Sequence, residues 1–395
     1  MDGSAASGQL IVGNERRVNH ERRVSHDLHF ELATAGHDAP LRRLLRENPM
    51  PGSISISLER EPEFFAAAEV EGSEHQTIVA IENGCLVASG SISARQRFIN
   101  GEPMRVGYLS GLRLDRSCKG RPEIIRRGYD MFRNIHERGG PLIYLSSIIA
   151  GNRTALRFLE RGLTGMPTYR FLGELVTLII RRSHLWKFKH PAPRARRVLR
   201  NRDLRALHGS HGSSADILEL LNRNNREYQF APVWSAGEIC AEDFWTVHEN
   251  FDTPVACARV WDQRAMKQSV VRGYSGALKW AKPFFNVAAT FLGTPRLPEI
   301  GGALSHVYLS HLAARHDQPE LTECLVNLVR ASPSARSADY VVIGFDSRDP
   351  RLAHLRRAFC GREYVSRIYA VYWEDGAAFA RNLEERLFAP EVATL

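Results

Sequence analysis

Between residues 27 and 182 the apolar positions follow two periods in turn, and each period predicts a different element. Apolar and polar residues alternate in four segments that we expect to be strands, 29–34, 76–82, 85–93 and 105–114. Asn83-Gly84 and Asn100-Gly101 separate the last three segments and are typical of tight hairpin turns. We therefore expect these three strands to pair antiparallel in succession.

A helical period begins at Pro122, a residue type that suits the first turn of a helix. Apolar residues at 124, 125, 129, 132 and 135 predict a helix over 122–139. The pattern then predicts a strand at 141–149, a helix at 152–162 capped by Asn152, and a strand at 169–180. Together with a helix at 39–48, these elements predict an α+β (mixed α/β) domain whose mostly antiparallel mixed sheet is flanked by helices.

The second half of the chain echoes the first at an offset of about 200 residues. The stretch Tyr108-Leu-Ser-Gly-Leu112 recurs as Tyr308-Leu-Ser-His-Leu312. Later segments follow in the same order, namely an apolar strand at 340–346, a helix at 348–359 and a closing strand at 363–373. This order predicts an internal duplication with two similar domains. The expected organisation is a flexible arm at 1–26, a first domain at 27–182, a linker at 183–214 and a second domain at 215–395.

Charge is concentrated in that linker. Residues 181–205 hold ten Arg or Lys and one acid, Asp203, which equals the whole net charge of +9. Pro191 and Pro193 lie inside this segment, and no series of aromatic residues accompanies it. We therefore interpret it as a solvated linker rather than a nucleic-acid interface.

The cysteines and the apolar segments bear on whether the protein binds a metal, where it is located and whether it spans a membrane. The six cysteines form no pair at zinc-ligand spacing, so we expect free thiols, no metal and a cytoplasmic location. No run of 18 apolar residues exists that would predict a membrane span. The most apolar segment, 277–292, contains Lys279, Lys282 and Pro283, and we interpret it as core or as a partner-facing segment.

A candidate anion site lies where the strand at 105–114 gives way to the helix at Pro122. A short loop before a helix directs several backbone N–H groups to one point, where the helix dipole also favours an anion. Lys119 and Arg121 add positive charge, and Gly120 allows the backbone to approach a ligand closely. The stretch is therefore consistent with a pyrophosphate site, or with a β-α turn that is basic for other reasons.

Residues 28–180 resemble the GCN5-related N-acetyltransferases (GNAT). In that family a loop of the form Gln/Arg-x-x-Gly-x-Gly/Ala wraps the pyrophosphate of acetyl-CoA, and the aligned stretch here is Lys119 to Ile124. Pro122 and Ile124 replace the small residues, and we expect proline to remove one donor and isoleucine to crowd the loop. The later pattern Asn152, Ala155 and Gly162 matches the family. Residues 215–375 match only at the level of pattern, without a phosphate loop after Leu312.

The resemblance implies acetyl-CoA, or another acyl-CoA, as co-substrate. It implies that the binding residues are Leu112, Arg113, Leu114, Lys119, Gly120, Arg121, Pro122, Glu123, Ile124 and Asn152. A backbone N–H within 112–114 would hold the thioester oxygen. The family's usual base and acid align with Tyr108 and Leu159, so neither expected group is present.

The catalytic candidates that remain are Tyr108, Ser110, Tyr144 and Ser146. Each also has a structural interpretation, since tyrosines on apolar strands are commonly packed core rings. The sequence thus predicts an N-acyltransferase that moves acetyl to an unknown small-molecule or protein amine by direct attack. The alternatives are a long-chain acyl-CoA or acyl-carrier-protein N-acyltransferase and a non-catalytic CoA-binding regulatory module. We expect a monomer or homodimer, with no metal and no nucleic-acid partner.

Overall fold

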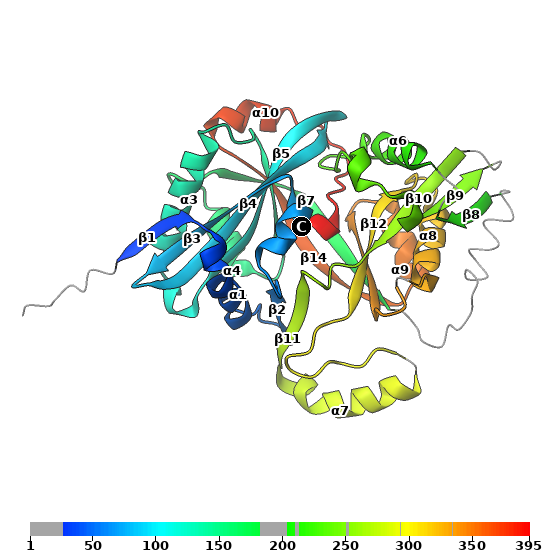
Figure 1. Ribbon diagram of the computed structural model, residues 1–395, viewed down its shortest axis with the longest axis horizontal. Helices are drawn as coiled ribbons and strands as arrows, with labels where there is room; N and C mark the ends of the chain where they lie inside the picture. Colours follow the sequence, from blue (N-terminus) through cyan, green and yellow to red (C-terminus); the bar gives the residue numbers. More distant parts are fainter. Residues whose placement is uncertain (1–26, 182–203, 210–212, 250–252, 293, 334) are drawn as a thin grey trace, which may run out of the picture.

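The computed structural model describes residues 27–181, 204–209, 213–249, 253–292, 294–333 and 335–395 (Figure 1). The predicted arm at 1–26 and most of the predicted basic linker lie outside the described residues. The end of that predicted linker is structured, because Leu204–His208 forms an edge strand and Ser213 caps the next helix. The linker interpretation did not anticipate this strand.

One twelve-stranded sheet runs through the molecule (Figure 1). Its strands, in spatial order, are β1 (Leu28–Leu32), β3 (Glu74–Glu82), β4 (Cys85–Ile99), β5 (Glu102–Leu114), β6 (Tyr144–Ile149), β14 (Gly361–Tyr372), β7 (Thr168–Arg181), β13 (Tyr340–Asp346), β12 (His306–Ala313), β10 (Thr253–Trp261), β9 (Phe244–Glu249) and β8 (Leu204–His208). A separate two-stranded ribbon pairs β2 (Ile54–Glu59) with β11 (Gln268–Tyr274). The sheet is mixed and mostly antiparallel, as the sequence predicted.

Helices flank this sheet. The α-helices of the described residues are α1 (Asp38–Glu47), α2 (Ala68–Glu71), α3 (Pro122–His136), α4 (Arg153–Leu159), α6 (Ser214–Asn225), α7 (Gly276–Phe291), α8 (Pro319–Ala331), α9 (Pro350–Ala358) and α10 (Ala377–Arg381). Short 3₁₀ turns occur at Ala35–His37, Phe65–Ala67, Arg116–Cys118, Ala236–Glu238, Ala241–Asp243, Glu374–Gly376 and Val392–Thr394. Every strand and helix predicted between 27 and 182 is present, and Asn83 and Asn100 have the positive φ expected of the hairpin turns.

The two halves of the chain exchange their last strands. β14 lies between β6 and β7 and pairs antiparallel with both. β7 in turn pairs antiparallel with β13, next to the strands of the second half. The strand β2 was not predicted from the sequence, and it too joins the two halves, because β2 pairs with β11. The domain boundaries stay a prediction, but the two halves share one hydrogen-bonded sheet.

The most apolar segment of the sequence is not in the core. It forms α7, whose Trp280, Phe284 and Phe291 are about four-fifths exposed (79%, 80% and 83%). The interpretation of 277–292 as core is therefore wrong. In Figure 1 the helix lies apart from the sheet, at the end of β11.

The contact between β5 and β6 depends on Gly107. The aromatic ring of Tyr144 lies over this glycine, and a Cβ added there would be 2.0 Å from the Tyr144 Cδ1 atom. Tyr144 is itself almost fully buried against Phe132 of α3. A side chain at 107 would therefore displace a core ring at the point where the parallel pair of strands begins.

We predict that Gly107→Ala lowers the free energy of unfolding by about 2 kcal/mol through this overlap. Urea denaturation followed by circular dichroism measures the change. Gly151→Ala is the matched control, since no atom lies within 4 Å of a Cβ at that position. Equal unfolding midpoints for the two variants would contradict the prediction.

Candidate functional site

β5 and β6 pair in parallel over only three positions before the ladder ends. The register joins Gly107 to Tyr144, Tyr108 to Leu145 and Leu109 to Ser146. Beyond these residues, Ser110–Leu114 pairs only with β4 and Ser147–Ile149 only with β14. We call these two diverging segments the first splay. Both sides of it reach solvent, because Leu112 and Ile149 are 37% and 38% exposed.

A β-bulge shapes the first splay. The register of β4 against β5 shifts between Ser89 and Ser91, and Gly111 on the opposite strand has a φ of 63°. A Cβ at Gly111 would lie 3.3 Å from the Ser91 Oγ atom. A bulge of this kind turns a strand's backbone groups away from regular pairing. The predicted backbone donors at Leu112, Arg113 and Leu114 follow directly after it.

The loop after β5 contains the residues of the predicted anion site. Asp115 accepts a hydrogen bond from the Ser117 backbone N–H at 2.9 Å, and Gly120 has a φ of 84° before α3 begins at Pro122. Lys119 is exposed, and its ammonium group has no side-chain partner among the described residues. Its charge is therefore available to an anion at the N-terminus of α3.

Two of the expectations for this loop need correction. The Arg121 guanidinium is not free, because it donates to Glu82 at 2.9 Å and to Glu123 at 2.8 Å. Hydrogen bonds to Glu82 and then to Glu123 raise the pKa of Arg121. Ile124 does not crowd the loop, since its side chain is 1% exposed and packs against Cys118. Arg121 thus clamps α3 to the end of β3.

Asn152 lies at the start of α4 as predicted. Its side-chain oxygen accepts a hydrogen bond from the Ala155 backbone N–H at 3.2 Å, so it caps that helix. Its part in CoA binding stays a prediction.

A buried cluster of charged groups lies beside the first splay. Glu71 is 2% exposed and forms ion pairs with Arg60, with Lys267 at 3.4 Å and with His75 at 3.5 Å. Buried polar atoms without a hydrogen-bond partner gather here, namely Arg60 Nη1, Glu71 Oε2, His75 Nδ1 and Lys267 Nζ. The Glu71 carbonyl accepts from Ser93, the strand partner of Tyr108. The cluster therefore lies against β4, opposite Tyr108 in the middle of the β5–β6 ladder.

The charges of this cluster set its protonation. Burial alone raises the pKa of Glu71, but Lys267, Arg60 and His75 together outweigh that effect and lower it. Burial lowers the pKa of His75, against the opposing influence of Glu71, and burial also lowers the pKa of Lys267. At neutral pH the cluster accordingly pairs a carboxylate with a neutral imidazole that can accept a proton.

A row of hydroxyl groups connects this cluster to the bulge. His75 Nε2 lies 3.2 Å from Thr77 Oγ1, which lies 3.0 Å from Ser91 Oγ. Ser91 is the strand partner of Ser110, whose Oγ atom is buried without a hydrogen-bond partner. Thr77 and Ser91 are also buried. The hydroxyl row thus crosses β3 and β4 and ends at Ser91, opposite Ser110 of β5.

The sequence singled out only one member of this arrangement, Ser110. The signal for the rest was a set of small hydroxyl residues at buried positions of otherwise apolar strands, Thr77, Ser89, Ser91 and Ser93. Arg60, Glu71, His75 and Lys267 could not be linked from the sequence, because Lys267 belongs to the second half of the chain.

The predicted catalytic tyrosines are placed differently from each other. Tyr108 is 5% exposed within an apolar cluster near Val392, and burial followed by the charge of Glu71 raises its pKa. Tyr144 binds His136 through its hydroxyl at 2.9 Å, and His136 contacts Asp375 at 3.0 Å. Tyr144 belongs to the first residue pair of the parallel ladder, whereas the first splay begins after the last pair. This position favours a packing role for Tyr144.

Ser146 lies at the last position of the parallel ladder. Its hydroxyl donates to the Leu109 carbonyl at 3.4 Å. It therefore connects β6 to β5 where the strands begin to diverge. The catalytic roles of Tyr108, Ser110, Tyr144 and Ser146 stay predictions.

The second half repeats the strand geometry of the first splay. β12 and β13 pair in parallel over three positions, and Tyr308 is paired with Val342 at the last of them. The register of β10 against β12 shifts between Cys257 and Arg259, and His311 there has a φ of 51°. Tyr308 and His311 correspond to Tyr108 and Gly111 at the predicted offset of 200. These matched features support the predicted duplication.

This second splay is closed by the protein's own side chains. Glu391 accepts a hydrogen bond from the His311 backbone N–H at 2.9 Å, at the bulge itself. The buried Arg351 guanidinium donates to the Ala314 carbonyl at 2.9 Å and to Asp349 at 2.6 Å. His311 and Ala314 are at most 2% exposed. Charged groups of the chain therefore occupy the place that is open in the first splay.

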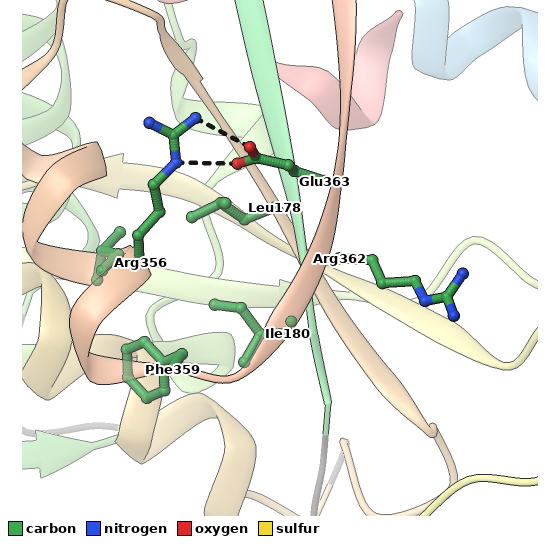
Figure 2. A pocket seen from close by; sticks show the side chains of 8 residues that line it. Leu178, Ile180, Arg356, Phe359, Arg362 and Glu363 are labelled. Carbon is green, nitrogen blue, oxygen red and sulfur yellow. Dashed lines mark hydrogen bonds and ion pairs between the residues drawn. The ribbon is translucent and has the colours of Figure 1, made fainter.

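A pocket of about 260 Å³ lies elsewhere in the second half (Figure 2). Leu178 and Ile180 of β7 form its base, and the Arg356–Glu363 ion pair at 3.0 Å lies along it, while Arg362 points away. It adjoins the start of β14, whereas Ser146 of the first splay pairs with Tyr369 near the end of that strand. The pocket is thus separate from the candidate site.

The described part of the chain contains neither a group of metal-ligating residues nor a membrane-spanning helix. Among these residues, no group of three or more His, Cys, Asp or Glu is placed to hold a metal ion. None of the described helices is long and apolar enough to cross a membrane.

Comparison by sequence finds no match, either to a protein-family model or to a curated protein. Comparison by structure finds many. A GCN5-related glucosamine N-acetyltransferase region of a fungal multi-domain GH3 β-N-acetylglucosaminidase aligns with 87% of this chain and 38% of its own, at 9% identity and a TM-score of 0.58. Saccharomyces cerevisiae N-myristoyltransferase with bound myristoyl-CoA aligns over 93% of this chain and 86% of its own, at 12% identity and a TM-score of 0.53.

A GCN5-related N-acetyltransferase from Kribbella flavida aligns over 88% of this chain and 71% of its own, at 13% identity and a TM-score of 0.44. The multi-domain fungal protein extends well beyond the part that this chain matches. The strand order, the bulge and the likeness to the fungal glucosamine N-acetyltransferase region agree, and the chain has the GNAT fold. The resemblance read from Lys119 to Ile124 and from Asn152 to Gly162 is confirmed at that level.

Closing the second splay leaves His311 in a buried, cationic environment. Burial lowers its pKa well below 6.5, and Arg259 and Arg95 act in the same direction. The unfolded chain binds a proton at this residue below about pH 6.5, whereas the folded chain does not. Stability contributed by the neutral ring is therefore complete above that pH and declines as the pH falls.

We predict that His311→Asn reduces the slope of unfolding free energy against pH between about pH 6.5 and pH 5 by up to one proton, or about 1.4 kcal/mol per pH unit. Asparagine tolerates the positive φ at this position. Denaturant titrations at a series of pH values measure the slope. A slope that the substitution leaves unchanged would show that His311 is protonated in the folded protein.

Proposed function

We propose that this chain is an acyl-CoA-dependent N-acyltransferase that binds the acyl-CoA in the first splay and passes the acyl group to an amine by direct attack. The observation that carries the proposal is the difference between the two splays. The first is open to solvent and leads to a cationic loop, while Glu391 and Arg351 fill the second. The GNAT fold of the chain supports the same reaction class.

The residues of the predicted anion site suit a pyrophosphate group. Gly120 keeps the backbone free of a Cβ where the loop turns into α3, and nothing lies within 4 Å of that position. Lys119 supplies a free positive charge, and Arg116 is exposed on the same loop. Leu112 and Ile149 offer apolar surface for the part of the ligand between the strands. An acyl-CoA bound here would supply an activated thioester.

The hydroxyl row supplies a path for the proton of the attacking amine. An ammonium group near its ordinary pKa of about 10 cannot attack until it loses a proton. Ser91 and Thr77 would relay that proton to the neutral ring of His75, once the Ser110 hydroxyl bonds to Ser91 and to the bound amine, and Glu71 would stabilise the imidazolium that results. The sequence-based candidates Tyr108 and Ser146 would then position the strands rather than move protons.

A longer acyl group is the second candidate for the donor. The likeness to an N-myristoyltransferase with bound myristoyl-CoA extends over nearly the whole of both chains. An acetyl donor needs only the thioester region of the splay, whereas a long chain needs apolar surface beyond it. Competition between acetyl-CoA and myristoyl-CoA in one binding experiment distinguishes the two donors.

We predict that Lys119→Ala weakens binding of acetyl-CoA by about tenfold, because one charge-assisted contact to phosphate is lost. Isothermal titration calorimetry measures the dissociation constant. Arg121→Ala should have a smaller direct effect on the ligand, since its guanidinium is paired with Glu82 and Glu123.

Lys279→Ala, a substitution of an exposed lysine on α7, is the matched control and should leave binding unchanged. If the wild-type protein binds none of CoA, acetyl-CoA and myristoyl-CoA, the proposal fails. If binding survives Lys119→Ala undiminished, the predicted anion site is not the phosphate site.

We also predict that His75→Gln lowers kcat by about 100-fold while the dissociation constant of acetyl-CoA stays the same. Release of CoA thiol in the presence of a panel of primary amines reports kcat. Because burial lowers the pKa of His75, wild-type activity should persist at neutral pH and fall only on the acid side of the ordinary histidine pKa of about 6.5. The acid limb should disappear in the variant, and a variant that keeps both rate and profile excludes His75 as base.

A further inference from the structure

The largest group of exposed apolar side chains in the described residues lies on α7. Trp280, Phe284, Val287 and Phe291 follow one another at helical spacing and are 79%, 80%, 59% and 83% exposed. At 100° per residue they fall within about 60° of one another on the helix. We call these four residues the α7 stripe. Leu292 and Ile300, at 63% and 65% exposed, extend its apolar surface.

The opposite side of α7 is fully engaged by the chain that returns from it. Asn286 donates to the Leu297 carbonyl at 3.0 Å and accepts from the Leu297 backbone N–H at 2.8 Å. Lys282 pairs with Glu299 at 2.6 Å, and Tyr274 donates to the Pro298 carbonyl at 2.7 Å. The helix is therefore held with the α7 stripe directed away from its own supporting loop.

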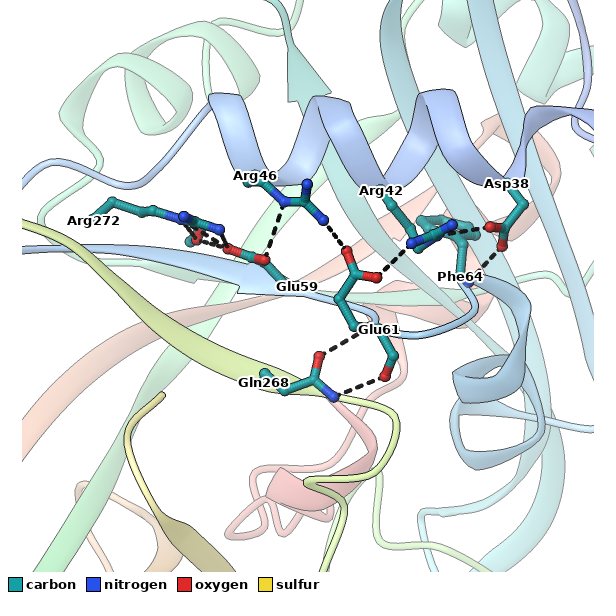
Figure 3. A network of polar contacts seen from close by, with 9 residues as sticks. Asp38, Arg42, Arg46, Glu59, Glu61, Phe64, Gln268 and Arg272 are labelled. Atoms are coloured by element: carbon teal, nitrogen blue, oxygen red, sulfur yellow. Dashed lines mark hydrogen bonds and ion pairs between the residues drawn. The ribbon is translucent and has the colours of Figure 1, made fainter. Parts of the chain in front are cut away.

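A rigid base carries this helix (Figure 3). Gln268 of β11 contacts the backbone N–H and carbonyl of Glu61, each at 2.9 Å, and Arg272 pairs with the buried Glu59 of β2. Arg46 of α1 pairs with the carboxylates of both Glu59 and Glu61. These contacts fix the β2–β11 ribbon to the body, so that α7 at its end is a projecting element and not a loose one.

The charges around the α7 stripe have one sign. Residues 276–298 contain Lys279, Lys282 and Arg296 and no acidic residue. Lys279 and Arg296 are exposed beside the apolar surface, and the one nearby acid, Glu299, is paired with Lys282.

This charge pattern argues against a second copy of the chain as the occupant. An isologous contact between two α7 stripes would bring the same cations of both copies together without acids to pair them. An anionic lipid surface provides what the helix lacks, an apolar layer for Trp280 and Phe284 beneath negatively charged headgroups. A tryptophan beside phenylalanines on the apolar face of a helix is also typical of the interface between water and lipid.

We propose that the α7 stripe inserts into the surface of an anionic lipid bilayer and so holds the protein at a membrane that it does not span. The helix lies parallel to the bilayer, with its aromatic side chains among the acyl chains and with Lys279 and Arg296 at the headgroups. This inference rests on α7 alone and is independent of the proposed acyl transfer.

Flotation of the full chain with vesicles tests the proposal. The protein should float with vesicles of equal parts phosphatidylglycerol and phosphatidylcholine, bind less to phosphatidylcholine alone, and lose affinity as salt is added. The double variant Trp280→Ser/Phe284→Ser should bind the anionic vesicles at least about tenfold more weakly. Lys279→Ala/Arg296→Ala should weaken binding to the anionic vesicles alone.

Leu32→Ser/Leu163→Ser is the matched control, because these leucines are exposed apolar residues outside α7, at 40% and 39%. It should float like the wild type. Light scattering of the lipid-free protein tests whether a second copy of the chain, rather than lipid, covers the α7 stripe. A wild-type dimer that the Trp280→Ser/Phe284→Ser variant disperses, without vesicle binding by either, assigns the α7 stripe to a second copy and overturns the proposal. Flotation that is absent, or equal in wild type and double variant, also overturns it.

Discussion

β14 holds the molecule together because it supplies the hydrogen-bonding partner of two strands from the other half. β6 has a parallel neighbour over only three residues, so its backbone depends on β14 for most of its pairing. β7 depends on β14 on one side and β13 on the other. An unpaired buried strand is costly, since each backbone group loses its hydrogen bond to water without replacement. The two halves therefore cannot form complete sheets separately, although their sequences repeat.

The first splay is a consequence of this exchange. β6 can diverge from β5 after Ser146 and leave an open edge because its other edge is paired along Ser147–Ile149 with β14. The second splay has the same bulge but a different filling. Glu391 accepts the hydrogen bond of the His311 backbone N–H, and Arg351 forms a buried ion pair with Asp349. Buried charges are tolerated there because each has a partner, and a ligand would have to displace them. The two splays thus share a strand geometry, but the first is open to solvent and the second is filled by side chains of the chain itself.

Charged and titratable side chains at the surface differ from those in the interior in how they are paired and protonated. Lys119, at the end of the first splay, has no side-chain partner among the described residues. Arg121, two residues later, is paired with Glu82 and Glu123. Inside, Glu71 remains charged only because cations from both halves surround it, and His75 beside it remains neutral. Charged and titratable side chains are therefore unpaired, ion-paired or neutral according to their burial and their neighbours.

The sequence alone determined most strands and helices of residues 27–182, because alternation, helical spacing and the Asn-Gly turns are local signals, but it missed β2 and α2. It also indicated the GNAT fold, through the loop from Lys119 to Ile124 and the cap at Asn152. It could not reveal that β14 lies between β6 and β7, or that Lys267 completes the Glu71 cluster, since both join residues far apart in the chain. Nor could it decide whether the apolar residues of 277–292 were buried. Their helical period is the same whether the helix faces a core or solvent, and only the tertiary packing around α7 determined that they are exposed.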